Sequence, residues 1–493
     1  MLARRAVMAL VLLSAIVVPA RASAALPPIK HVWVIQLENH SYDETFNNAA
    51  QPYLWTQLRT MGQVLTQFHA TGHASLDNYI TQISGQAPNV DTMADCQHYI
   101  DVTPGIMATD GQVLGQGCVY PAAAKTLVDQ LEAKDLTWRG YMEDMGNDPA
   151  REPATCGAPQ PNTDDKTQQA APDDQYAARH NPFVYFHSIL DVPGRCEAHV
   201  VPLTALQGDL AAISTTPNFN WITPNLCNDG HDATPCAGPN AKGTHEGDLI
   251  AADAFLAKWV PVITGSPAFQ QDGLLLITLD ESSIGDSSAC CGEPAGLNTP
   301  MPGITGPGGG RIGTLAISPY VQPGSTNDKP YNHYSLLRSM EDLFGIPEHL
   351  GYAAKPDVPA FGDDVYNRPG GGPVPGAPPL SARDAGSTGK AQKLRVFLRS
   401  RAPRRLSRVR RGFSARIAIT GSDRMTTAVQ VRLRRGKRVV ASSGRPGTVA
   451  HGHGRLRVRP RSAAPPGRYR LELRAFHEGK VVARDSKRVW IGR

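Results

Sequence analysis

Four apolar runs without regular polar alternation constrain the fold of this chain most strongly. They occupy residues 32–37, 219–222, 274–279 and 312–317, and segments with helical spacing separate them. Continuously apolar strands must be covered on both faces, and intervening helices provide that cover. We therefore predict an α/β fold with a mainly parallel sheet and helices on both faces. The helical patterns lie at 122–136, 203–213, 249–262 and 334–344.

Two of these runs end directly in oxygen-bearing side chains. Glu38 and Asn39 follow residues 32–37, and Asp280 and Glu281 follow residues 274–279. Open parallel sheets bind ligands beyond the carboxyl ends of their strands. Crowded carboxylates repel one another and need a cation, and an oxygen-rich set favours Ca²⁺, Mg²⁺ or Mn²⁺ over zinc. The four residues are a candidate divalent-metal site; ordinary solvated strand ends are the alternative.

A candidate nucleophile lies in the segment 71–80. Small and turn-forming residues there precede a helical pattern that runs from Asn78 to about residue 83. Ser75 would then lie near a helix N-terminus, where free amides and the helix dipole favour a phosphoryl oxyanion. A simple N-cap serine is the alternative interpretation.

The N-terminus has the pattern of a secretory signal. Arg4 and Arg5 precede an apolar run at 6–18, and a small-residue stretch at 22–24 follows. This order predicts cleavage after Ala24, and the run is too short for a membrane anchor. We expect residues 1–24 to be a signal peptide and the mature protein to be secreted or extracytoplasmic, with no transmembrane anchor.

The cysteines indicate disulfide bonds. Eight cysteines in an exported chain favour disulfides over a zinc site, because no pair of CxxC clusters is present. The shortest loops to close are Cys96 with Cys118 and Cys227 with Cys236. The others are Cys156, Cys196, Cys290 and Cys291.

The formal net charge of +6 hides a division of the chain into an acidic and a basic part. Residues 383–493 hold 31 Lys and Arg against 5 Asp and Glu, a net charge of +26, whereas residues 1–382 carry −20. A Pro- and Gly-rich linker is predicted at 367–390. Short alternating runs after it predict an Ig-like antiparallel β-sandwich at 391–493 with a cationic surface. Such a domain could contact anionic surfaces, and it has no recognised nucleic-acid motif.

Seven collinear motifs between residues 29 and 350 carry a family resemblance. The chain resembles the bacterial phosphoesterase family, which contains phospholipases C and secreted acid phosphatases within the alkaline-phosphatase-like superfamily. The resemblance implies a phosphoesterase catalytic domain at residues 25–366 and does not reach the basic tail. The motifs are IKHVWVIQLENHSYDETF, HASLDNYITQISG, RHNPFVYF, NLCNDGHD, ADAFLAKWVPVI, LLLITLDE and NHYSLLRSMEDLFGI.

The resemblance also implies roles for individual residues. Glu38, Asn39, Asp280 and Glu281 would hold the metal, and Ser75 would attack phosphorus near it. Asn78 would contact the phosphoryl oxygens. The motif histidines would bind phosphate or protonate the leaving group: His73, His180, His231 and His333. The chain departs from the family pattern at Ala74 and Asp77, where prolines are usual.

Three functions are compatible with these observations. The first is an exported metal-dependent phosphomonoesterase of the acid-phosphatase type, which includes phosphoinositide phosphatases, acting through a phosphoserine. The second is a phospholipase C, which cleaves a diester and needs room for a diacylglycerol. The third is not an enzyme: a polyanion-binding surface protein whose catalytic scaffold has degenerated.

Overall fold

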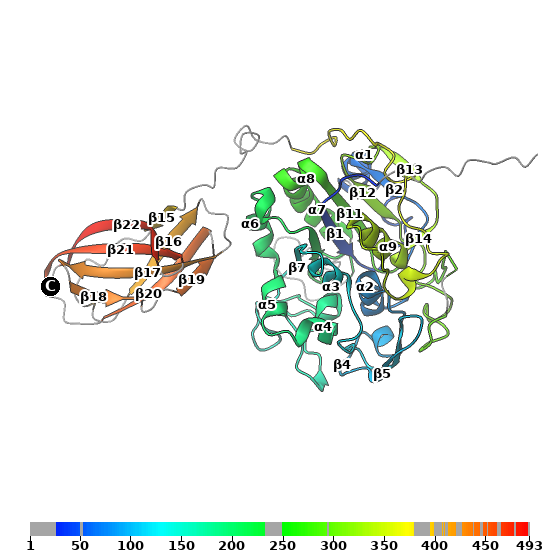
Figure 1. The fold of residues 1–493 in the computed structure, drawn as a ribbon, viewed down its shortest axis with the longest axis horizontal. Helices are drawn as coiled ribbons and strands as arrows, with labels where there is room; N and C mark the ends of the chain where they lie inside the picture. Colours follow the sequence, from blue (N-terminus) through cyan, green and yellow to red (C-terminus); the bar gives the residue numbers. More distant parts are fainter. Residues whose placement is uncertain are drawn as a thin grey trace, which may run out of the picture.

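The computed structural model shown in Figure 1 contains a mixed α/β body and an antiparallel β domain. It describes residues 26–49, 53–231, 249–292 and 295–378 of the body. Of the tail it describes residues 395–398, 407, 409, 413–420, 426–436, 438–443, 447–450, 452–460, 465–477 and 480–491. The predicted signal peptide and residues 379–390 of the predicted linker lie outside the described residues.

The body is built on a central sheet whose strand order is β13-β2-β12-β11-β1-β10-β7-β9. Within this sheet β12 is antiparallel to both neighbours, and the other adjacent pairs are parallel. The α/β prediction is confirmed. The strands are β1 (His31–Leu37), β2 (Gln63–Leu65), β7 (Trp138–Met142), β9 (Val200–Pro202), β10 (Phe219–Thr223), β11 (Gly273–Leu279), β12 (Thr314–Ile317) and β13 (Ser325–Asn327).

The four predicted apolar runs correspond to β1, β10, β11 and β12. The sequence interpretation missed the other four strands of the sheet. β7 contains Arg139 and Gly140, so it does not form a continuous apolar run, and β2, β9 and β13 are only three residues long.

Helices cover the sheet on both faces. Every residue of β1, β10 and β11 is buried, which requires cover on both sides. Helix α2 (Ser75–Ser84) packs against α3 (Leu127–Glu132) and α9 (His333–Leu343), and α7 (Leu249–Thr264) packs against α8 (Pro267–Asp272) (Figure 1). Shorter helices are α1 (Arg59–Met61), α4 (His187–Leu190), α5 (Arg195–His199) and α6 (Leu206–Asp209).

Two of the four helical predictions were too long. The patterns at 249–262 and 334–344 match α7 and α9, but α3 begins only at Leu127 and α6 is four residues long. A capping box formed by Thr126 and Asp129 fixes the start of α3. The described helices include none that is long and apolar enough to cross a membrane.

Small two-stranded sheets flank the central sheet. Their strands are β3 (Phe68–His69) with β14 (Tyr331–Asn332), β4 (His98–Tyr99) with β8 (Thr163–Asp164), and β5 (Thr103–Met107) with β6 (Val113–Gln116). The packed chain of the body continues past the predicted boundary at Tyr366, because Val374 is buried in the body core.

The tail forms an antiparallel β domain, as predicted. β20 pairs with β16 over most of its length and with β18 at its end, so the sheet turns a corner there. The last two of the short alternating runs, at 480–483 and 489–491, belong to one long strand, β22 (Lys480–Ile491). The other strands are β15 (Arg395–Leu398), β16 (Phe413–Thr420), β17 (Thr426–Arg435), β18 (Arg438–Ser442), β19 (Gly447–Ala450), β20 (Gly452–Pro460) and β21 (Gly467–His477).

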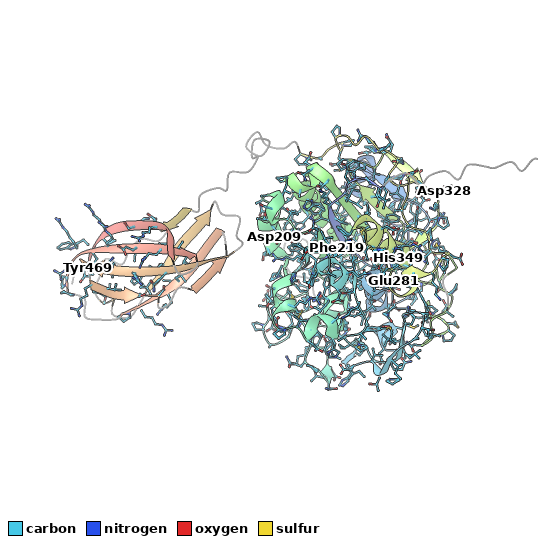
Figure 2. The ribbon with its side chains drawn as sticks, viewed as in Figure 1. Asp209, Phe219, Glu281, Asp328, His349 and Tyr469 are labelled. Atoms are coloured by element: carbon cyan, nitrogen blue, oxygen red, sulfur yellow. A yellow bond between two sulfur atoms is a disulfide. The ribbon has the colours of Figure 1, made fainter. Side chains whose placement is uncertain are left out.

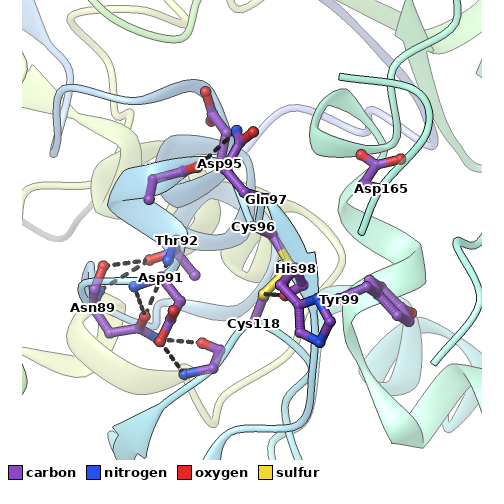
Figure 3. Close-up of a disulfide and its surroundings, with 12 residues drawn as sticks. Asn89, Asp91, Thr92, Asp95, Cys96, Gln97, His98, Tyr99, Cys118 and Asp165 are labelled. Atoms are coloured by element: carbon purple, nitrogen blue, oxygen red, sulfur yellow. Dashed lines mark hydrogen bonds between the residues drawn. A yellow bond between two sulfur atoms is a disulfide. The ribbon is translucent and has the colours of Figure 1, made fainter. Parts of the chain in front are cut away.

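Disulfide bonds join several cysteines of the body. The predicted bond between Cys96 and Cys118 is present (Figure 3), and Cys156 bonds Cys196 and Cys290 bonds Cys291. Cys227 is also disulfide-bonded, and its predicted partner Cys236 lies outside the described residues. None of the cysteines in the described ranges is free.

The Cys96–Cys118 bond supports the start of α2. It ties down the loop that carries Asp95 (Figure 3). The Asp95 carboxylate accepts a hydrogen bond from the Leu76 backbone N–H at 3.0 Å. Leu76 lies in the first turn of α2, where backbone N–H groups lack partners within the helix. The disulfide and the carboxylate therefore help to position the residues around Ser75.

A buried carboxyl group on α9 should make stability depend on pH. Burial raises the pKa of Glu341 from 4.5 to about 8, and its side chain accepts a hydrogen bond from Leu350 N–H. The native state then binds a proton that the unfolded state releases, so stability falls as pH rises between these two values. Glu341→Gln keeps the acceptor and should raise the free energy of unfolding near pH 8 by a few kcal/mol, roughly.

The check on this prediction is chemical denaturation of both proteins across this pH range. The difference should vanish below the lower pKa, where both states of the wild type carry the proton. The neighbouring Asp342→Asn is the control, because Asp342 is partly exposed and pairs with His349. An equal stability of Glu341→Gln and wild type near pH 8 would contradict the expectation.

Candidate active site

The carboxyl ends of β1 and β11 bring the predicted metal ligands together. The two strands run in register up to Leu37 and Leu279, so Glu38 and Asp280 leave the sheet side by side. The Asn39 backbone N–H donates to Asp280 Oδ1 at 2.9 Å, and the Asn39 amide donates to Glu281 Oε1 at 3.1 Å. Asn39 adopts a left-handed conformation with φ of 46°, which asparagine tolerates better than most residues. Figure 2 shows Glu281 among the surrounding side chains.

Ser75 lies against this acidic pair at the start of α2. Its Oγ–H donates to Glu38 Oε2 at 2.9 Å, and the Tyr79 hydroxyl donates to the other oxygen, Glu38 Oε1. Tyr79 was not among the predicted site residues. The available signal was its spacing, since residues four apart on a helix share a face and Tyr79 follows Ser75 by four.

Asn78 holds the loop that precedes Ser75. Its Oδ1 accepts hydrogen bonds from Thr71 and Gly72, and its Nδ2 donates to the carbonyl oxygens of Gly72 and Ala74. Both ends of the amide are therefore engaged with the loop. In this structure Asn78 positions the loop, which differs from the phosphate contact that the family resemblance implies.

His73 connects the loop before Ser75 to Glu281. Its Nδ1 lies 2.5 Å from Glu281 Oε2, and its Nε2 lies 2.8 Å from the carbonyl oxygen of Asp286. A carbonyl can only accept, so Nε2 carries a proton. With both ring nitrogens occupied, His73 orients the Glu281 carboxyl group.

His180 is buried between the acidic groups and an aromatic ring. It stacks on Tyr79 with ring centroids 5.3 Å apart, and its ring nitrogens lie 3.5 Å from Glu38 Oε2 and 3.6 Å from Asp229 Oδ2. Burial, followed by the charges of Arg179 and His231, lowers its pKa well below the usual value. The ring is therefore favoured in its neutral form.

The other two predicted histidines occupy different environments. His333 is fully buried at the start of α9 and donates through Nε2 to the Asp280 carbonyl oxygen at 2.6 Å. Burial lowers its pKa to about 4, so His333 is neutral at neutral pH. His231 is only half-buried, donates its backbone N–H to Asp229, and interacts electrostatically with Asp280 and His180.

A fifth acidic or amide side chain, Asp229, lies at this edge of the sheet. It was not among the predicted site residues. It follows β10, the other parallel neighbour of β1, and its carbonyl oxygen accepts from Glu38 N–H at 2.9 Å. The signal was present, because Asp229 lies in the NLCNDGHD motif beyond a buried strand. The strand-end rule that selected Glu38 and Asp280 points to residues directly after a strand, however, and five residues separate Asp229 from the end of β10.

The carboxyl groups at this edge suppress one another's ionisation. Burial raises the pKa of each of the four, and the charge of Asp280 raises those of Glu38, Glu281 and Asp229 further. Each group costs free energy when it ionises without a nearby positive charge. A divalent cation would remove this cost.

The donor set fits a hard divalent cation. Three buried oxygens of the five side chains at this edge have no hydrogen-bond partner among the described residues: Asp280 Oδ2, Asp229 Oδ2 and Asn39 Oδ1. Carboxylate and amide oxygens are the ligands that Ca²⁺ and Mg²⁺ prefer. Across the described ranges, no group of three or more His, Cys, Asp and Glu side chains is placed so that it could hold a metal ion, so these side chains would have to move to close around a cation. Hydrogen bonds from Ser75, Tyr79 and Asn39 occupy several of the other carboxylate oxygens.

Asp77, which replaces a family proline, adds less negative charge than its sequence suggests. It is buried, and burial together with the charge of Glu281 raises its pKa well above the usual value. The carboxyl group lies against Gly72, where a Cβ would come within 2.4 Å of Asp77 Oδ1. A residue without a side chain is therefore needed at position 72.

Comparisons with known proteins show which family this chain belongs to. The model of the phosphoesterase family matches residues 44–347. The chain is 24% identical over 313 residues to a phosphate-repressible acid phosphatase from Penicillium chrysogenum, which covers 64% of this chain and 58% of that protein. It is 25% identical over 344 residues to a phosphatidylinositol-3-phosphatase from Mycobacterium tuberculosis, which covers 69% of this chain and 86% of that protein.

The extent of these matches differs between relatives. The chain spans less than three fifths of the length of the fungal acid phosphatases that it matches. A solved protein in the alkaline phosphatase superfamily from Vibrio parahaemolyticus aligns with a TM-score of 0.40 and 12% identity, covering 67% of this chain and 69% of that chain. The family model covers more than half of the chain and all the predicted site residues except Glu38 and Asn39. The chain therefore belongs to the phosphoesterase family.

Proposed function

We propose that this protein is an exported, metal-dependent phosphomonoesterase that acts through a phosphoserine at Ser75. The observation that carries the proposal is the contact between Ser75 Oγ and Glu38 Oε2 inside a buried acidic cluster, at the N-terminus of α2. The family membership supports phosphoester hydrolysis. The relatives named acid phosphatase and phosphatidylinositol-3-phosphatase support a monoester substrate.

The proposed reaction has two displacements at phosphorus. Ser75 Oγ forms a bond to phosphorus in line with the leaving alkoxide, whose bond to phosphorus breaks. The O–H of Ser75 already points at Glu38, so the serine proton has an acceptor as the bond forms. Water then attacks the phosphoserine, which releases inorganic phosphate and returns the proton to Ser75.

The metal would be held by Glu38, Asn39, Asp280 and Glu281, with Asp229 as a further oxygen donor. When bound, the cation would lower the pKa of the serine hydroxyl and neutralise part of the charge of the phosphate dianion. The acidic character of the body makes this neutralisation important, since residues 1–382 carry a net charge of −20.

Of the motif histidines, His231 is the best candidate for protonating the leaving alkoxide. It is only half-buried, whereas His180 and His333 are at most 1% exposed. His73 has both ring nitrogens engaged by Glu281 and Asp286. A proton donor must be able to exchange with solvent, and the partial exposure of His231 allows this.

Export is proposed from the sequence pattern and from the oxidised cysteines. Disulfides persist in oxidising compartments such as the bacterial periplasm and the extracellular space. The bonds Cys96–Cys118 and Cys156–Cys196 are compatible with the predicted signal peptide at residues 1–24.

A lipid phosphate is a second candidate substrate class. Four large hydrophobic side chains are exposed on the segment after Glu281: Ile284 (75%), Leu297 (56%), Met301 (46%) and Ile304 (46%). This segment lies at the site, because His73 N–H donates to Pro302 and His73 Nε2 to Asp286. Exposed apolar residues beside a phosphate site favour a substrate with an apolar part. This observation keeps phosphoinositides and the phospholipase C alternative in consideration.

A substrate and metal panel tests the proposal. The metal-stripped protein should regain turnover of p-nitrophenyl phosphate with added Ca²⁺, Mg²⁺ or Mn²⁺. Phosphatidylinositol phosphate and phosphatidylcholine serve as parallel substrates. Release of diacylglycerol from phosphatidylcholine without monoester turnover would make the protein a phospholipase C. No turnover of any phosphoester with any cation would favour the polyanion-binding alternative.

Tyr79→Phe should weaken metal binding while leaving the fold intact. The substitution removes one of the two hydrogen bonds that orient Glu38. Loss of a partner of this kind typically costs about 10- to 100-fold in metal affinity or activity. The metal concentration for half-maximal activity should rise by this factor. Tyr99→Phe is the matched control, because it loses a buried hydroxyl contact to Val184 away from the site. An unchanged metal requirement in Tyr79→Phe would refute the positioning role.

A further inference from the structure

The outer face of the tail sheet carries arginines in register across three strands. β17, β21 and β22 are adjacent, and Val431, Leu433, Leu471 and Leu473 on their inner face are buried. The alternate residues must point outward. We call the arginines among these outward residues the arginine face: Arg432, Arg434, Arg468, Arg470, Arg474, Arg484 and Arg488.

This arrangement places like charges directly opposite one another. Arg470 is paired with Arg434 on one side and Arg488 on the other, and Arg474 is paired with Arg484. Directly opposed like charges on neighbouring strands destabilise a sheet. Such a pattern lowers stability unless anions from outside the domain neutralise it.

Few acidic groups neutralise the arginine face from within. Glu472 lies in its middle and pairs with Arg434 at 3.4 Å. Arg468, Arg470, Arg484 and Arg488 are exposed and form no ion pair or side-chain hydrogen bond with the residues that the structure describes. Their guanidinium groups are available to bind oxyanions, which arginine contacts through two parallel hydrogen bonds.

One exposed aromatic side chain accompanies the arginines. Trp490 is 62% exposed and lies directly opposite Arg468. Tryptophan is enriched at the level of lipid headgroups, where its ring meets both water and hydrocarbon. Proteins that bind single-stranded nucleic acid instead use several aromatic side chains, on which successive bases stack.

We propose that the arginine face docks the protein on an anionic phospholipid bilayer. The charges are spread in two dimensions, about 4.8 Å apart between strands and about 6.7 Å between alternate residues, so they suit a plane of phosphate headgroups. Trp490 would lie among the headgroups at the edge of the contact. The proposal does not depend on the catalytic function, because no residue of the arginine face belongs to the candidate active site.

The charge division of the chain favours contact through the tail. Residues 1–382 carry −20 and are repelled by an anionic surface, whereas residues 383–493 carry +26 and are attracted to it. Each arginine near an anionic membrane contributes about a fivefold increase in binding. The attraction should weaken as ionic strength rises, because the Debye length shortens.

The test is co-sedimentation of the full chain with phosphatidylcholine vesicles that contain or lack phosphatidylglycerol. R470Q/R488Q should bind the anionic vesicles about 25-fold more weakly than wild type at low salt. The matched control is R457Q/R459Q, which removes the same charge from β20, a strand that β18 and β17 separate from β21. The control should retain most of the affinity, and Trp490→Ala should lose part of it.

Two further measurements keep the test decisive. R470Q/R488Q should have a thermal midpoint at or above that of wild type, because the substitution removes repulsion, and its turnover of soluble phosphoesters should be unchanged. Equal binding to vesicles with and without phosphatidylglycerol would overturn the proposal, as would equal losses in the two double variants. Binding to single-stranded DNA that R470Q/R488Q abolishes, while vesicle binding persists, would make the partner a nucleic acid instead.

Discussion

Ser75→Ala should abolish phosphoester turnover, with a decrease in kcat of about 10⁴-fold or more. Ser75 supplies the oxygen that attacks phosphorus, and Oγ is the side-chain atom that contacts Glu38. The small residue left behind fits the start of α2, so the fold should persist. The comparison is made with saturating divalent cation and a soluble phosphomonoester.

Ser84→Ala is the control for this result. Ser84 lies at the other end of α2, and its hydroxyl donates to the Ile80 carbonyl oxygen within the helix. Its removal alters the helix without touching the acidic cluster, so turnover should stay close to wild type. Full activity in Ser75→Ala would overturn the proposed mechanism and would favour the degenerate-scaffold alternative.

Asp280→Asn should have opposite effects on stability with and without metal. In the metal-free protein the substitution removes one of several buried, mutually repelling carboxyl groups, so the free energy of unfolding should rise near neutral pH. Divalent cation should stabilise the wild type, by about 2.7 kcal/mol at a concentration 100 times Kd. The variant should lose this gain and should lose at least about 100-fold in activity.

The metal-free protein should become less stable as pH rises. Burial raises the native pKa of Glu38, Asp229, Asp280 and Glu281 above the unfolded values. These groups stabilise the native state at pH values below the unfolded pKa, and their contribution is lost as pH rises through the native pKa. Chelator should therefore destabilise the protein more at neutral than at acid pH. A Tm that is insensitive to chelator at all pH values would contradict the metal site.

Asp272→Asn is the matched control for Asp280→Asn. Asp272 precedes β11 at its opposite end and forms a 2.5 Å contact with His31. Its substitution should lower stability by loss of that pair, but the stabilisation by divalent cation should be unchanged.

The strand-end rule explains how much of the site was predictable from sequence. Buried apolar runs locate β1 and β11, and the polar residues directly after them, Glu38 and Asp280, do lie together. Asp229 was not predicted, because five residues separate it from the end of β10. The length of a loop does not indicate where the chain comes back to the site. The position of such a residue depends on tertiary contacts.

The roles of the polar residues were harder to predict than their location. Asn78 and His333 lie at the site, as the resemblance implied. However, Asn78 Nδ2 and His333 Nε2 both form hydrogen bonds to backbone carbonyl oxygens. These partners come from the folded backbone and leave no pattern in the sequence. Likewise, β7 was not predicted because it contains the charged residue Arg139. Arg139 can be buried because it pairs with Asp209, which only the fold brings close to it.

The measurement that tests the central claim most directly is the trapping of the covalent intermediate. The protein is mixed with a phosphomonoester in the presence of divalent cation, quenched with acid and analysed by peptide mass spectrometry. A phosphoryl group on Ser75 that depends on the cation and is absent from Ser75→Ala is the predicted result. Turnover without phosphorylation of Ser75, or with phosphate on a histidine such as His231, would contradict the account.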